Sequence, residues 1–187
     1  MGRLAGIVFV LLCVVVATAD SHNAAVRPWT VADLALVHRL RAPTAIPALP
    51  TGTRVLRFEQ FFRTPVGPRG LEPAPDLLAA AGKRVRVFGY MVLHDNPSPG
   101  LFLLAPWPLT LAERADGQAD DLPPAVLTVH VPDDRREVPM PYVPGVLMLQ
   151  GRLEVGAVDE PDGRRSFVRL QLDPPDQPMA AAQGNDR

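Results

Sequence analysis

Histidines are the side chains of this 187-residue chain best suited to metal chemistry, because a neutral imidazole binds zinc and copper well. No two of the four are spaced four residues apart, as ligand pairs on one helix are. His94, followed by Asp95, ends one predicted strand, and His130 ends another. A folded sheet could bring these ends together. We therefore keep His94, Asp95 and His130 as candidate metal ligands, beside the simpler interpretation that they are ordinary rim residues.

Nucleophilic and phosphate-binding patterns are absent from the sequence. The serines are few, and none stands in a nucleophile elbow. No paired-carboxylate motif stands out either. The Gly-rich stretch Gly67–Gly70 lacks the Gly-Lys-Ser/Thr ending of a phosphate loop. The sequence therefore predicts a protein that is not an enzyme and that carries no cofactor.

Basic residues occupy the polar positions of three predicted strands. Alternation with Val85 and Val87 predicts that Arg84 and Arg86 face outward, and the same reasoning applies to Arg152 and Arg169. Cross-strand pairing of Arg with Glu gives a structural explanation. A site that binds an anion or a peptide is the functional explanation of the same pattern. These four arginines are accordingly candidate partner-binding residues.

Two aromatic residues, Trp107 and Tyr142, are further candidates for contact with a protein partner. Trp107 stands between Pro106 and Pro108, a stiff setting unlike that of a core strand. Exposed, rigid aromatic side chains often anchor protein interfaces. Both lie in Pro-rich loops, residues 106–124 and 132–144, and proline lowers the entropy that a loop loses on docking.

Composition excludes several classes of protein. The net charge is −1, so a bulk electrostatic attraction to nucleic acid is not expected. A single Cys rules out a disulfide or a Cys-based zinc site within one chain. Proline is the unusual residue, with 22 occurrences, and it predicts stiff loops.

The N-terminus has the pattern of a secretory signal peptide. Arg3 precedes an apolar run from Leu4 to Val16, and Ala17-Thr18-Ala19 offers a cleavage site. The run is shorter than the roughly 20 apolar residues of a membrane span. We expect cleavage after Ala19 and a periplasmic or secreted protein without a stable membrane span. An uncleaved anchor is the alternative.

The remaining chain predicts an all-β fold. A helix is expected at 30–41, and strands at 83–93, 101–105, 125–131, 146–155 and 167–172, with a turn at Asp162-Gly163. Five short strands without intervening amphipathic helices favour a small OB-like barrel, with a sandwich as the alternative. The predicted divisions are a signal peptide (1–19), a helical arm and Pro-rich linker (20–53), the barrel (54–173) and a tail (174–187).

The barrel region resembles a group of exported bacterial proteins of unknown function with OB-like domains. The resemblance covers residues 54–172 and includes a first strand of the pattern GK-V-R-x-x-GYMV. Its segments are Gly67–Pro73, Gly82–Val87, Gly89–Val92, Phe102–Pro106, Asp120–Pro124, Pro144–Gly145, Gly151–Gly156, Asp162–Arg164, Ser166 and Val168–Leu170. Some wider relatives carry a Cys and a His just after the fourth segment, where this chain has Trp107–Thr110. The resemblance implies a fold and a compartment but no activity.

The sequence thus predicts an exported, non-enzymatic binding or accessory module of the bacterial envelope. It would contact a protein partner through loops 106–124 and 132–144. The alternative is a periplasmic carrier of a metal or small ligand that uses His94, Asp95 and His130.

Overall fold

The computed structural model describes residues 31–174, except 112, 115–116, 119–121, 133–135 and 138. The predicted signal peptide and nearly all of the predicted tail lie outside the described residues. None of the helices within the described part of the chain has the length and apolar character needed to cross a bilayer.

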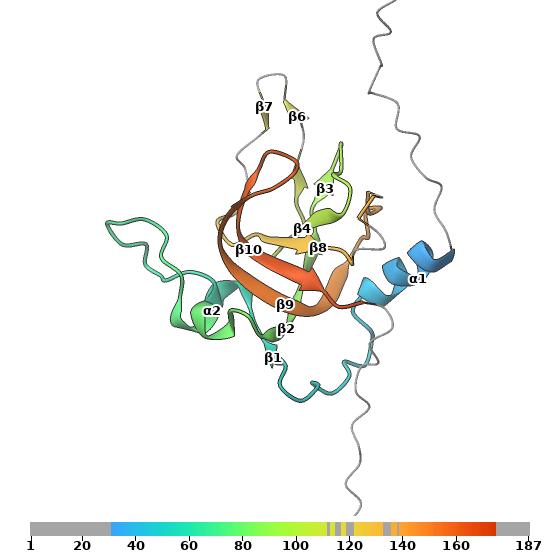
Figure 1. Ribbon diagram of the computed structural model, residues 1–187, viewed down its shortest axis with the longest axis horizontal. Helices are drawn as coiled ribbons and strands as arrows, with labels where there is room; N and C mark the ends of the chain where they lie inside the picture. Colours follow the sequence, from blue (N-terminus) through green and yellow to red (C-terminus); the bar gives the residue numbers. More distant parts are fainter. Residues whose placement is uncertain are drawn as a thin grey trace, which may run out of the picture.

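Five strands form a sheet that closes on itself (Figure 1). They are β2 (Arg84–Met91), β4 (Leu101–Ala105), β8 (Leu127–His130), β9 (Val146–Asp159) and β10 (Arg165–Leu172). Pairing runs from β2 through β4, β8, β10 and β9 back to β2. Strands β8 and β10 are parallel, and the other neighbours in this ring are antiparallel. The predicted all-β class is confirmed, and all five predicted barrel strands are present. The OB-like assignment stays a prediction.

Gly89 marks the point where β2 passes from one neighbour to the other. Residues up to Tyr90 pair with β9, while Tyr90 and Met91 pair with β4. A Cβ on Gly89 would lie 2.8 Å from the carbonyl oxygen of Ala105 and 2.9 Å from the ring of Phe58. No side chain fits at this crossing, which explains the glycine within a strand.

Alternating apolar residues fill the barrel. Leu147, Leu149 and Leu153 of β9 are fully buried, as is Leu170 of β10. Complete burial of one such leucine contributes about 1.5–3 kcal/mol relative to leaving it exposed. The period-two pattern of the sequence therefore identified the core face of both strands.

Helix α1 (Val31–Leu40) and the arm that follows it pack on the barrel. Leu36 and Leu40, one helical turn apart, join the core. The arm continues onto β9, where the main-chain N–H of Ala42 donates a 2.9 Å hydrogen bond to the Val146 carbonyl oxygen. The predicted helix is confirmed over these residues.

A second helical layer covers another part of the barrel. β1 (Arg54–Val55) adds to β2 in parallel, and the 3₁₀ helix η1 (Phe58–Gln60) follows it. β1 is only two residues long, and η1 begins at Phe58. Helix α2 (Pro75–Ala80) has proline in its first turn and buries Leu77 and Ala80.

Four short strands lie in the loops. β3 (Leu93–His94) pairs with β5 (Thr110–Leu111), which fastens the predicted loop 106–124 to the end of the first barrel strand. β6 (Glu113–Arg114) pairs with β7 (Gly117–Gln118). The predicted loop 132–144 contacts the barrel through the buried side chains of Met140 and Val143.

Candidate functional site

Arg86 does not face solvent, and this part of the sequence-based prediction is wrong. Its side chain is 2% exposed. The Nη1 group donates a 2.6 Å hydrogen bond to the Pro47 carbonyl oxygen, and Nη2 donates to the Ala48 carbonyl oxygen at 3.2 Å. The arm thus covers the outer face of β2 at this position. Burial lowers the pKa of Arg86, because desolvation disfavours the charged guanidinium.

Arg169 is the second arginine whose predicted exposure is wrong. Its side chain is buried, and Nη1 donates to the Gly156 carbonyl oxygen at 2.7 Å and to Ser166 Oγ at 3.1 Å. The Nε group lies 3.4 Å from a carboxylate oxygen of Glu154. Arg169 therefore stabilises the β9–β10 hairpin rather than presenting a charge to a partner.

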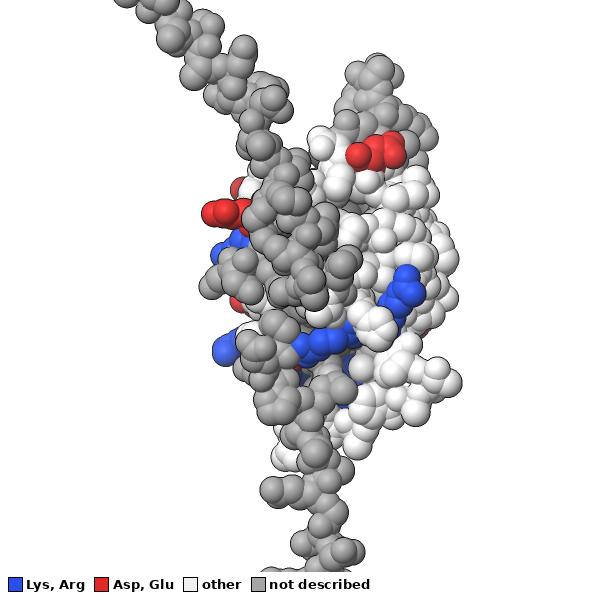
Figure 2. All heavy atoms as spheres, turned by 90° about the vertical axis from the view of Figure 1, so that its right-hand side faces the viewer, with Lys and Arg blue, Asp and Glu red and all other residues white. Residues whose placement is uncertain are grey.

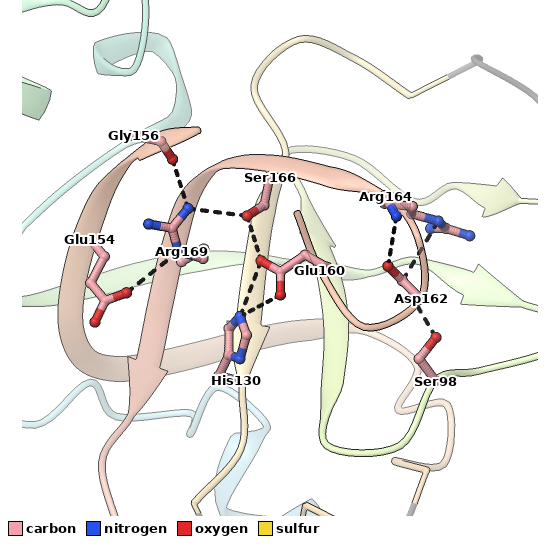
Figure 3. A network of polar contacts seen from close by, with 9 residues as sticks. All are labelled: Ser98, His130, Glu154, Gly156, Glu160, Asp162, Arg164, Ser166 and Arg169. Carbon is pink, nitrogen blue, oxygen red and sulfur yellow. Dashed lines mark hydrogen bonds and ion pairs between the residues drawn. The ribbon is translucent and has the colours of Figure 1, made fainter. Parts of the chain in front are cut away.

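A polar network continues from Arg169 through the barrel wall (Figure 3). Ser166 donates a short hydrogen bond to Glu160, whose carboxylate oxygens lie 3.2 and 3.3 Å from His130 Nε2. Glu160 and Ser166 are buried. Each of these side chains satisfies another, as buried polar groups must. The serine bonds to the carboxylate rather than to the imidazole, so the network lacks the order of a Ser-His-acid triad.

The two other candidate arginines remain at the surface. Arg84 is partly exposed and forms an ion pair with Asp173, with Nη2 2.7 Å from Oδ2. Arg152 is exposed and lies opposite Arg84 in the β2–β9 ladder. Of the four predicted partner-binding arginines, the structure leaves these two accessible.

The three candidate metal ligands do not converge. Among the described residues, no group of three His, Cys, Asp or Glu side chains could hold a metal ion. His130 contacts Glu160, whereas His94 Nε2 lies 2.5 Å from the Arg164 guanidinium and Nδ1 lies 3.1 Å from the Asn96 N–H. A neutral imidazole accepts at only one nitrogen, so the two His94 contacts are alternatives that depend on the tautomer. Asp95 is exposed.

His94 instead belongs to a contact between two barrel loops. Asp162, in the β9–β10 turn, accepts from the Arg164 main-chain N–H at 3.0 Å and from Ser98 Oγ at 3.4 Å. Arg164 reaches across to His94. The contact joins β3 and the loop after it to the turn before β10, and Figure 3 shows its Ser98, Asp162 and Arg164 side chains at the right.

Trp107 lies where the sequence predicts an accessible aromatic residue. It is 52% exposed and borders an apolar groove of about 280 Å³. Val66 and Leu71, from the loop between η1 and α2, line the same groove and are also exposed. Pro123 and Pro124 also line it. Pro-stiffened segments thus hold three exposed apolar side chains around one depression.

Tyr142 is exposed as well, at 42%, but it does not line the Trp107 groove. Its neighbour Val143 is buried, with its main-chain N–H 3.4 Å from the sulfur of Met91. The structure therefore does not join the two predicted contact loops into one surface at these aromatic residues.

Several residues of these sites escaped the sequence analysis. Glu160 has the appearance of a turn residue, and nothing local marks Val66 or Leu71 as neighbours of Trp107. Ser166 does carry a signal, because it stands two positions before Val168 on the otherwise apolar side of its strand. A polar residue at such a position predicts a buried partner.

Comparisons with known proteins are sparse. No family model matches the chain, and no curated protein matches it. A search of solved structures finds a DUF3299 family protein from Pseudomonas aeruginosa, with 15% sequence identity and a TM-score of 0.41. The alignment covers 68% of this chain and 95% of that chain. A similarity this distant carries no information about function.

Proposed function

We propose that this protein is a non-enzymatic binding or accessory module of the bacterial envelope. It contacts a protein partner through the groove beside Trp107, and its export depends on the N-terminal signal sequence. The observation that supports the proposal best is the half-exposed Trp107, held between two prolines above an apolar groove.

The chemistry of the groove defines the kind of partner segment that would fit. Its walls are mainly apolar, and exposed Val66, Leu71 and Trp107 surround it. An apolar side chain inserted there gains about 25 cal/mol per Å² of apolar area that it buries. Glu59 and Arg63 also line the groove, so it carries one charged side chain of each sign. The expected partner is therefore an apolar protein segment.

Catalysis and metal carriage have less support from the polar residues than partner binding has from the groove. The Ser166–Glu160–His130 network is buried and internally satisfied, which suits a structural role better than catalysis. Carriage of a metal by His94, Asp95 and His130 stays a prediction from the sequence that no contact in the described chain favours.

Site-specific crosslinking in the native host tests the proposal. A photoreactive residue at position 71 would lie in the groove, whereas the same residue at position 167 would replace exposed Phe167 outside it. The proposal predicts a reproducible adduct with one envelope protein from position 71 but not from position 167. Equal adducts from both positions, or none from either, would contradict it.

A further inference from the structure

A second cleft lies between helix α1, the arm and the barrel, away from the Trp107 groove. It has a volume of about 410 Å³, within the range of small-molecule sites. Its floor is apolar and consists of Leu36 and Leu40 of α1, Met148 of β9 and Leu172 of β10. These four side chains are at least nine-tenths buried where α1 packs on β9 and β10, so the floor is firmly held.

The rim of the cleft is basic. Arg41 and His38 are exposed, and their side chains form no ion pair with any residue that the structure describes. Arg39 and Arg84 also line the cleft. The carboxylate at the rim is that of Asp173, which lies 2.7 Å from Arg84 Nη2. Figure 2 views the side of the molecule that carries α1 and shows basic side chains across its middle and lower part.

A buried positive charge adjoins the cleft. Gln150 lines the cleft and lies 3.5 Å from Arg86 Nη2 through its side-chain oxygen. Arg86 is nine-tenths buried or more, and its Nε has no hydrogen-bond partner. Within the described part of the chain, no carboxylate pairs with this guanidinium. Because a charge inside protein is screened less than one in water, its potential extends to the cleft.

Main-chain hydrogen bonds fix both ends of the cleft. The Ala42 N–H donates to the Val146 carbonyl oxygen at 2.9 Å, and the Asp173 N–H donates to the Gln150 carbonyl oxygen at 3.0 Å. Met148 lies midway between these two acceptors on β9. The rim and floor are therefore attached to one strand, and a ligand would enter a preformed site.

We propose that this cleft binds an anionic amphiphile. Its carboxylate or phosphate group would bind Arg41 and Arg84, and its apolar chain would lie against Leu36, Leu40 and Met148. The basic rim favours a ligand with an anionic group. The apolar floor favours binding of an amphiphile over binding of a free inorganic ion. This site is independent of the Trp107 groove, so either proposal can fail without the other.

Isothermal titration of the full chain tests the ligand class. The probes are dodecanoate and dodecyl phosphate below their micelle concentrations, with dodecyl maltoside and inorganic phosphate as matched controls. We expect both anionic amphiphiles to bind at least tenfold more tightly than either control. Equal binding of the maltoside would overturn recognition of charge, and equal binding of inorganic phosphate would overturn recognition of the chain. Absence of binding by both amphiphiles would overturn the site.

Two variants test the assigned residues. Arg41→Gln should weaken dodecanoate binding about tenfold, since it removes a hydrogen bond between two charged groups. Asp173→Asn should strengthen binding severalfold, because it frees Arg84 from its carboxylate. Arg57→Gln, at an exposed position that borders a different pocket, is the control and should leave the dissociation constant within twofold. If Arg41→Gln leaves the dissociation constant unchanged, the proposed site is overturned. If Asp173→Asn leaves it unchanged, the proposed role of Arg84 in binding the anion is overturned.

Discussion

The Arg86 guanidinium donates a 2.6 Å hydrogen bond to the carbonyl oxygen of Pro47. This contact joins the arm that follows α1 to the outer face of β2. It makes a residue that looks like a surface arginine part of the interior. The contact spans 39 positions of sequence, so it closes a long loop of the chain onto the barrel.

Replacement of Arg86 should destabilise the protein. Arg86→Ala removes hydrogen bonds to two arm carbonyls and leaves a cavity, so we expect the free energy of unfolding to fall by about 2–4 kcal/mol. Arg86→Met keeps most of the packing volume and should lose less. Urea denaturation measures both. Exposed Arg57 is the matched control, and a loss in Arg86→Ala no greater than in Arg57→Ala would show that the arm contact is unimportant.

Gly89→Ala should be costly because its methyl group meets backbone and ring atoms within 3 Å. Overpacking of this kind costs about 1–3 kcal/mol, and the barrel crossing cannot relax without separating β2 from β4. Gly67→Ala is the control, because nothing lies within 4 Å of a Cβ there. Thermal unfolding should show a clear drop in Tm for the first variant and almost none for the second. Similar Tm values for the two would refute the close approach at Gly89.

Removal of the Glu160 carboxylate should unfold the hairpin side of the barrel more readily. Glu160→Ala leaves Ser166 and His130 without their shared acceptor, and each buried polar group left unsatisfied costs about 1–3 kcal/mol. Asp159→Ala breaks the neighbouring exposed pair with Arg165 and should cost less than about 1 kcal/mol. Chemical denaturation of both variants compares them directly. The interpretation fails if the two losses are equal.

Metal ions should not stabilise the protein through its histidines. Contacts with Arg164 and Glu160 compete with any ligation by His94 and His130. We expect Zn²⁺ or Cu²⁺ to change the Tm of the wild type by no more than it changes that of a His94→Ala/His130→Ala variant. A stabilisation that disappears in this double variant would restore the metal-carrier alternative.

The sequence predicts the barrel strands well because their information is local. Leu147, Leu149 and Leu153 stand at odd positions of β9, whereas polar Gln150, Arg152 and Glu154 stand at even ones, so period two identifies the buried face. The same rule fails at Arg86, because it assumes that the opposite face meets water. The arm residues that cover this face are Pro-rich and show no periodicity, so no local pattern announces their contact.

Site residues, too, can be predicted from the sequence only where their signal is local. Trp107 was identified from its own neighbours, the two prolines, which are adjacent in sequence. The groove beside it needs Val66 and Leu71, which the fold brings there from about 40 positions away. Likewise His130 and Glu160 are 30 residues apart, and no spacing rule joins them. Side chains that act alone can be read from sequence, whereas those that act through distant partners require the fold.

Photocrosslinking from position 71 tests most directly whether the Trp107 groove binds a protein partner. The adduct is compared between the wild-type chain and Trp107→Ala in the native host. Trp107 is 52% exposed, so its truncation should cost less stability than loss of a fully buried aromatic residue, and the Tm of the variant is measured beside the crosslinking. We expect the envelope-protein adduct formed by the wild type to fall at least tenfold in Trp107→Ala. An adduct of undiminished yield in the variant would show that the Trp107 groove does not bind the partner.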